Sequence, residues 1–462
     1  MKTLSLALRN LLRNRRRSIT TLLAMIVGAH AVLLFGGYTR NITYGLQTDY
    51  VKYGGHLQIE RKGYYEFGSG DPAAYGIANY REIADTLKAD PVLASMVTVV
   101  TPTLQLQGIA GNFREGVSRT ALALGVVVDD QNRMRAWNDY RFPVTIPPLA
   151  LTGTDTDAAI VGTGLARVLQ LCGQLEVKNC APQTRPHDNT GPDLPADVAQ
   201  LASATEPVPE KAAQYPTIEL LAATALGAPN VSELHVVKAE QQGVKEYDDM
   251  YVGLHLAQAQ RLVYGSDQPK ATAIVVQLKH TAELPAAKAR IEELLGTRFK
   301  GEETEVVDYM TLNPFYGQAL AMFATLFGFI ALLIAAIVLF TVGNTMSMAV
   351  FERTVEIGTL RAMGLRREGV RRLFLCEGLL LGILGASLGV LSAAALAAII
   401  NHNGLTWTPP GRSPVPLIIR VWGENDLIAG TAVGLLAVSV LSALLPARRA
   451  SRMNIVDALR YA

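Results

Sequence analysis

Four long apolar segments constrain the fold of this chain more than any other feature of its sequence. They cover residues 18–40, 317–350, 373–400 and 427–447 of the 462 residues. A helix needs about 20 consecutive, mainly apolar residues to cross the roughly 30 Å hydrocarbon core of a bilayer, and each segment reaches that length. Charged residues make up only 18% of the chain, below the roughly 25% of an average soluble domain. The sequence therefore predicts an α-helical membrane protein with four transmembrane helices.

The distribution of arginine predicts the orientation of these helices. Residues 1–17, 351–372 and 448–462 are rich in arginine, whereas the 401–426 loop contains two. The short flanks that carry the excess of Lys and Arg remain in the cytoplasm. Both termini and the 351–372 segment are therefore expected in the cytoplasm. Residues 41–316 and the 401–426 loop are expected on the opposite side.

A cleavable signal peptide is an alternative reading of the first apolar segment. Its basic flank and the sequence Ala29-His30-Ala31 imitate a cleavage site. The apolar run nevertheless continues to Phe35 beyond that site. This continuation favours a helix that stays in the protein.

The region from residue 41 to 316 has the pattern of a water-soluble α+β domain. Strand-like alternation occurs near its start, at Gly55–Arg61, and near its end, at Thr272–Lys279. An amphipathic helical pattern follows each of them. The two ends are expected to pack together as one domain, with residues about 131–235 as an insert. Residues 181–216 are rich in Pro, Asp, Asn, Thr and Ala, and they are expected to form a loop.

The three cysteines predict no metal site, because no metal-type spacing such as C-x-x-C occurs. Cys172 and Cys180 lie close together in the soluble region, and Cys376 lies at the start of the third apolar segment. An oxidising compartment would permit a Cys172–Cys180 disulfide. The sequence leaves open whether this pair is bridged.

No catalytic, metal or nucleotide site is predicted in this chain. The acidic pairs at 129–130 and 248–249 are expected to be turn or surface residues, and His235, His255 and His280 are too scattered for a metal site. The phosphate-binding pattern G-x-x-x-x-G-K-[ST] does not occur. The formal net charge of +2 gives no indication of a nucleic-acid partner.

The 351–372 segment is predicted to contain a short amphipathic helix. Ile357, Leu360 and Gly364 recur at helical spacing among dense charges, and Gly364 is a plausible stop. Such a stripe must be buried against lipid or a partner protein. The alternative is a charged turn that only sets the topology. Glu377, near the start of the third apolar segment, is expected to pair with an arginine.

Glycines at a spacing of three to four residues occupy the third apolar segment: Gly378, Gly382, Gly385 and Gly389. Small residues at this spacing let a neighbouring transmembrane helix approach closely. The sequence leaves open whether that neighbour belongs to the same chain or to a second subunit.

A motif of closely spaced residues follows the second apolar segment. It comprises Glu352, Arg353, Glu356, Ile357, Gly358, Leu360, Arg361, Ala362 and Gly364. This motif resembles the signature of the FtsX-like ABC transporter permeases (type VII), a family that includes the macrolide exporter MacB and the lipoprotein-release permeases. The ends of the chain, Leu6–Asn14 and Pro446–Arg460, also resemble that family.

The resemblance implies a fold, a place in the cell and a set of partners. It implies four membrane helices in the bacterial inner membrane and a MacB-like periplasmic domain between the first two. The nine motif residues would form a coupling helix that docks on a separate ATPase subunit, since this chain lacks the fused ATPase domain of MacB. Two ATPase copies would bind ATP and Mg, so the chain itself would carry no cofactor and no enzyme activity.

The resemblance also implies a mechanism, called mechanotransmission, in which ATP hydrolysis moves the periplasmic domain. The permease would pair with a second copy of itself or with a paralogue. The expected cargo is an amphiphile such as a lipoprotein or a lipid, with a periplasmic carrier or adaptor and membrane lipids as further partners. The alternative is a non-transporting regulator of a periplasmic cell-wall hydrolase.

Overall fold

The structure, a computed structural model, describes residues 2–13, 15–68, 70–142, 146–180, 215–407 and 415–459. It divides into two compact units. Unit 1 comprises Met1–Leu46 and Phe315–Ala462, and unit 2 comprises Gln47–Pro314.

Unit 1 is helical, and four of its helices are long and apolar enough to cross a membrane. They are α2 (Arg15–Gly54), α13 (Pro314–Glu352), α15 (Arg367–His402) and α16 (Asn425–Arg452). Shorter elements are α1 (Lys2–Arg13), α14 (Thr354–Ala362) and α17 (Ile455–Leu459), with the strand pair β10 (Thr406–Trp407) and β11 (Val415–Pro416). The chain is thus a multi-pass membrane protein.

Each of the four helices extends beyond its predicted apolar segment. The largest difference is in α2, which continues from residue 40 to Gly54. Hydropathy detects only the part of a helix that is apolar, whereas backbone hydrogen bonds continue through the polar residues that follow. The helix boundaries therefore could not be read from hydropathy.

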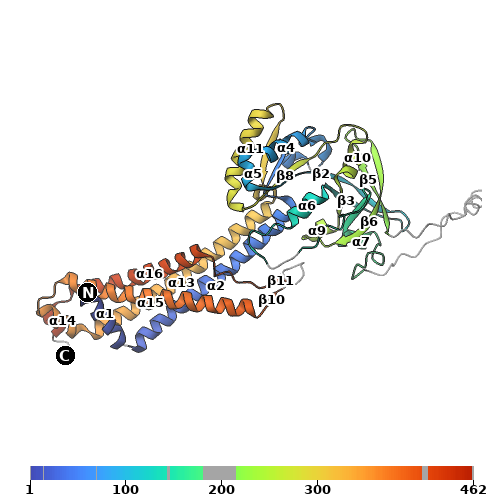
Figure 1. Cartoon of the computed structure of the whole chain (residues 1–462). Coiled ribbons are helices and arrows are strands. Elements are labelled where there is room, and N and C mark those ends of the chain that lie inside the picture. Colours follow the sequence, from blue (N-terminus) through green and yellow to red (C-terminus); the bar gives the residue numbers. More distant parts are fainter. Residues whose placement is uncertain are drawn as a thin grey trace, which may run out of the picture. The chain divides into compact units, whose positions relative to one another are not determined.

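The long helices run alongside one another (Figure 1), and small residues let them approach closely. The core between α2, α13, α15 and α16 contains Met25, Ala29, Val338, Val342, Met346, Leu381, Ala386, Leu435 and Ala443. The Ser439 hydroxyl on α16 donates to the Gly378 carbonyl on α15 over 2.8 Å. A buried hydroxyl that bonds the backbone of a neighbouring helix satisfies its polar group without water.

Unit 2 contains a nine-stranded mixed sheet in its described residues. The strands are β1 (Leu57–Arg61), β2 (Val97–Asn112), β3 (Val117–Val126), β4 (Ala158–Gly162), β5 (Thr217–Ala223), β6 (Pro229–Glu240), β7 (Tyr251–His255), β8 (Ala273–Leu278) and β9 (Thr304–Asp308). Their order is β3-β7-β4-β6-β5-β2-β8-β1-β9, and β3 also pairs with β2. The first six strands therefore close into a ring.

Strand β2 joins two parts of unit 2. Its first half, Val97–Thr103, pairs with β8, and its second half, Leu104–Asn112, pairs with β3. The closed ring surrounds one apolar core together with α7 (Thr163–Val168) and α10 (Leu256–Tyr264). The open part, β8-β1-β9, packs a second core against α4 (Tyr80–Ala89), α5 (Pro91–Met96) and α11 (Leu284–Arg298).

The two ends of unit 2 lie together, since β1 pairs with both β8 and β9. The prediction of an insert over residues 131–235 differs from the structure. From that range, β4, β5 and β6 pair with β7 and β2 in the closed ring, so they are integral to the domain. The predicted loop over residues 181–216 lies, except for its last two residues, outside the described residues.

Candidate functional site

The candidate site is the α14 segment, which connects α13 to α15. Helix α13 ends at Glu352, α14 covers Thr354–Ala362, and α15 begins at Arg367. Helix α14 ends just before Gly364, as the sequence predicts. Gly364 has a φ of +97°, its N–H donates to the Arg361 carbonyl, and the Leu365 N–H donates to the Leu360 carbonyl. Two such bonds around a left-handed glycine terminate a helix.

A buried ion pair fixes the start of this segment to α15. Arg353 Nη1 lies 3.0 Å from Glu377 Oε1, and the two side chains are only 8% and 3% exposed. Asn10 of α1 completes the cluster: its Nδ2 donates to Glu377 Oε1 over 2.7 Å, and its carbonyl accepts from Arg353 Nη2 over 3.1 Å. The predicted pairing of Glu377 with an arginine is therefore present, and the partner is Arg353.

An apolar cluster fixes the inner face of α14. It contains Val350, Ile357, Val370, Phe374, Ala447 and Ala450. Arg361 donates to the Met453 carbonyl between α16 and α17, and α17 packs beside α14. The segment is thus attached to α13, α15 and α16 rather than free to move as a loop.

The end of helix α1 and the start of α2 contact the same segment through two further ion pairs. Arg13 Nη2 lies 2.6 Å from Glu356 Oε1, and Arg17 at the start of α2 pairs with Glu352. Both glutamates belong to the predicted motif. Asn10, Arg13 and Arg17 were not among the predicted site residues, since the sequence contains no signal for a contact between residues more than 300 positions apart.

One face of α14 remains exposed. Val355 is 39% exposed, Met363 is 72% exposed, and Glu356, Thr359 and Ala362 lie on the same side. These five residues recur at intervals of three to four positions, which places them along one face of a helix. We refer to Val355, Glu356, Thr359, Ala362 and Met363 as the outer face of α14.

The nine motif residues therefore fall into three groups by burial. Glu352, Glu356, Ala362 and Gly364 are exposed, Leu360 and Arg361 are partly buried, and Arg353, Ile357 and Gly358 are buried. The expectation that Ile357 and Arg353 contact a partner differs from the structure, because both side chains are occupied within this chain. Val355 and Met363 were not predicted, although their spacing along the helix could have indicated them.

The four glycines of α15 pack against helices of the same chain. A Cβ at Gly378 would lie 2.7 Å from the Ala443 Cβ of α16, and one at Gly389 would lie 2.5 Å from the Ala29 Cβ of α2. Gly382 faces Ser439 of α16, and Gly385 faces Met25 of α2. Of the two alternatives that the sequence leaves open, the structure has the packing within one subunit.

The acidic pair at 248–249 has a structural role in unit 2. Asp248 is buried, and its carboxylate accepts from Thr163 N at 3.0 Å, Gly164 N at 2.8 Å and Gln242 N at 2.8 Å. The carboxylate satisfies the first N–H groups of α7, which have no partner within the helix. The prediction of a surface residue was therefore wrong for Asp248.

The remaining titratable groups of unit 2 form no metal cluster in the part of the chain that the structure describes. Asp139 lies 2.7 Å from His280 Nδ1 and raises the pKa of that exposed imidazole. Burial lowers the pKa of His56, which lies edge-on to Trp137, to about 4. Cys172 and Cys180 form a disulfide, which is the bridged alternative of the two that the sequence leaves open.

Comparison with known proteins identifies the part of the chain that contains α14. Residues 326–455 match the family described as FtsX-like permease C-terminal. The ABC transporter permease YvrN of Bacillus subtilis, itself uncharacterized, is 30% identical over 208 residues, which are 43% of this chain and 46% of that protein. The lipoprotein-releasing system transmembrane protein LolC of Neisseria meningitidis is 27% identical over 240 residues, which are 50% of this chain and 56% of LolC.

A third relative is the macrolide export ATP-binding/permease protein MacB of Neisseria gonorrhoeae. It is 28% identical over 190 residues, 40% of this chain and 27% of MacB. This chain thus spans about half the length of YvrN and LolC and about a quarter of MacB. Residues 326–455, which contain all of α14, α15 and α16 and most of α13, therefore carry the FtsX-like permease C-terminal domain, and the chain is similar to ABC transporter permeases.

Proposed function

We propose that this chain is the permease subunit of an ABC transporter and that the outer face of α14 docks on a separate ATPase subunit. Two ATPase copies would bind ATP and Mg, and a second permease subunit would complete the complex. The observation that carries this proposal is the attachment of α14. The buried Arg353–Glu377 ion pair at its start and an apolar cluster on its inner face join it to the long helices, while its outer face is exposed and makes the Arg13–Glu356 ion pair.

This attachment suits a helix that transmits force. A docked helix delivers movement to the membrane only if it moves with the spans as a rigid element. Because Ile357 is buried among residues of α13, α15 and α16, a displacement of α14 would displace those helices. The interior of such a cluster is close-packed and has little compressibility.

The cluster of arginines at the α14 end supports a cytoplasmic position for α14 and both termini. Unit 2 would then lie in the periplasm of an inner-membrane protein. The Cys172–Cys180 disulfide supports an oxidising compartment for unit 2. The similarity to LolC favours an amphiphilic cargo such as a lipoprotein or lipid, which unit 2 would extract or export by mechanotransmission with a periplasmic carrier or adaptor.

The test is co-purification of this chain with a separate ABC ATPase from the same genome, co-expressed with it. The variant combines Val355→Asp with Met363→Asp, which alters the outer face and leaves the buried cluster intact. We expect the wild-type chain to co-elute with the ATPase and the variant to bind about tenfold more weakly or worse, because central apolar anchors of an interface contribute about 2 kcal/mol.

Val244→Asp is the matched control, since Val244 is an exposed valine of unit 2. It should leave co-elution unchanged. Equal co-elution of the outer-face variant and the wild type would show that α14 is not the docking surface. A wild-type chain that never associates with this ATPase would contradict the permease proposal itself.

A further inference from the structure

Helix α1 has a third face that neither the bundle nor α14 covers. Ala7 is buried, and Asn10 and Arg13 contact Glu377 and Glu356. Leu8 and Leu12, one helical turn apart, are 46% and 59% exposed. No described residue of this chain buries these two leucines, which lie side by side on a twelve-residue helix, and an apolar environment would shield them from water.

Arginines border these leucines. Arg9, Arg15 and Arg16 are exposed, and no ion pair with a carboxylate is found for them among the described residues, whereas Arg13 and Arg17 pair with Glu356 and Glu352. Three exposed positive charges, Arg9 on α1 and Arg15 and Arg16 at the start of α2, therefore lie within a few residues of Leu8 and Leu12 along the chain.

The position of α1 relative to the first membrane helix narrows the choice of partner. Helix α1 ends at Arg13, and α2, which is apolar enough to span a membrane, begins at Arg15. Leu8 and Leu12 are therefore only a few residues from the point where the chain enters the bilayer. Exposed leucines beside arginines at that point suit a helix that lies in the membrane interface.

We propose that α1 binds the anionic phospholipid headgroups of the adjacent leaflet, with Leu8 and Leu12 inserted at the acyl boundary and Arg9, Arg15 and Arg16 on the lipid phosphates. Juxtamembrane Lys and Arg side chains are attracted to anionic lipid surfaces and less to zwitterionic ones. Because Asn10 and Arg13 of the same helix hold Glu377 and Glu356, bound lipid would also support the position of α14.

The inference depends only on the membrane helices and requires no ATPase, so it is tested in vesicles that contain the full chain alone. An environment-sensitive fluorophore is attached at Leu12→Cys in a Cys376→Ser background; the other two cysteines form the disulfide. Vesicles of phosphatidylcholine are compared with vesicles that contain about 30% phosphatidylglycerol. We expect blue-shifted emission and quenching by spin-labelled lipid in the phosphatidylglycerol vesicles, and weakening of both by salt.

Arg9→Gln and Arg16→Gln should each lower the ratio of buried to exposed label by about fivefold, the effect of about one lost arginine interaction. Arg449→Gln and Arg452→Gln are the matched controls, because both arginines are exposed in the same unit but outside α1. Inorganic phosphate added to phosphatidylcholine vesicles should not reproduce the blue shift.

Three outcomes would overturn the inference. The first is a label with the same emission in both kinds of vesicle. The second is an equal loss in the Arg449→Gln and Arg452→Gln controls, which would indicate general charge attraction. The third is a label that becomes shielded only when the ATPase is added, which would make this face a protein contact. A failure of ATPase binding alone leaves the lipid inference intact, and a failure of lipid binding alone leaves the ATPase proposal intact.

Discussion

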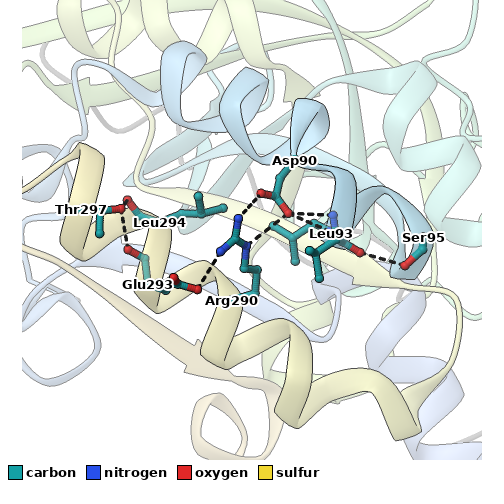
Figure 2. Close-up of polar contacts among 8 residues, drawn as sticks. Asp90, Leu93, Ser95, Arg290, Glu293, Leu294 and Thr297 are labelled. Atoms are coloured by element: carbon teal, nitrogen blue, oxygen red, sulfur yellow. Dashed lines mark hydrogen bonds and ion pairs between the residues drawn. The ribbon is translucent and has the colours of Figure 1, made fainter.

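Arg290 of α11 holds the carboxylate of Asp90, which caps helix α5, at an Nη2–Oδ2 distance of 2.7 Å (Figure 2). Oδ1 of the same carboxylate accepts from the N–H groups of Val92 and Leu93 over 3.1 and 3.0 Å. One buried side chain thus satisfies the start of α5 and joins it to α11. These two helices and α4 cover the second core of unit 2.

Asp90→Ala should destabilise unit 2 by about 1–2 kcal/mol, because it removes a helix cap. The Arg290 hydrogen bonds keep the pKa of Asp90 below its usual value. A carboxyl with a lowered folded-state pKa stabilises the fold above the unfolded-state pKa, near 4, and this contribution is lost as the pH falls through the folded-state value. The difference between wild type and Asp90→Ala should therefore be present at pH 6 and shrink toward pH 3.

Thermal unfolding of the full chain in nanodiscs measures this difference. Glu293→Ala is the control, because Glu293 binds the same arginine but its side chain is 60% exposed. An exposed pair contributes about 0–1 kcal/mol. Equal effects of the two substitutions would contradict the capping role of Asp90.

The Arg353–Glu377 pair should show strong coupling in a double-mutant cycle. Glu377→Leu alone leaves the buried Arg353 guanidinium without its anion, and we expect a loss of about 3–5 kcal/mol. The double variant Arg353→Met with Glu377→Leu should recover most of that loss, since no unpaired charge remains. Unfolding in nanodiscs measures all four members of the cycle. Additive losses would mean that the two side chains do not act as a pair.

Gly389→Leu should disrupt the packing of α15 against α2. The new Cβ would meet the Ala29 Cβ at 2.5 Å, and overpacking of this kind costs about 1–3 kcal/mol. Gly434→Leu on α16 is the matched control, because a Cβ there has nothing within 4 Å. The thermal unfolding temperature should therefore fall for Gly389→Leu and stay equal or rise for Gly434→Leu. The opposite order would place the contact of Gly389 outside this chain.

The membrane helices could be predicted because apolar length is a local property of the sequence. The stop of α14 was also predictable, since Gly364 supplies the left-handed backbone that a helix end requires. The local sequence does not show, however, what a buried apolar stripe packs against. Ile357 has the same spacing whether it packs inside the chain or against a partner, and only the positions of Phe374 and Ala447 show that it packs inside.

In unit 2, too, the local sequence could not show which distant residues come into contact. The alternation that indicates β2 is visible in the sequence, and its second half pairs with β3, which follows directly in the chain, but the pairing of its first half with β8 depends on residues more than 100 positions away. The role of Asp248 was missed for the same reason. Its partners Thr163 and Gly164 lie on a helix more than 80 positions earlier in the chain.

Glu60 is a buried carboxyl without a full set of partners. It is 2% exposed, its Oε2 has no hydrogen-bond partner, and it lies opposite Glu305 in the pairing of β1 with β9. Burial, followed by the charge of Glu305, raises the pKa of Glu60 to about 7. Between pH 4.5 and about 7, the folded protein therefore keeps a proton on Glu60 that the unfolded chain has already lost.

A folded-state pKa above the unfolded value of 4.5 means that stability falls as the pH rises from about 4.5 through 7. Glu60→Gln removes this loss, because the amide stays neutral at all these pH values. Relative to wild type, the variant should gain stability between pH 5 and pH 8, by an amount on the order of 1–3 kcal/mol. Thermal unfolding across this range measures the gain. The exposed Glu82→Gln should show no such trend, and a Glu60→Gln difference that stays constant with pH would show that Glu60 is ionised throughout.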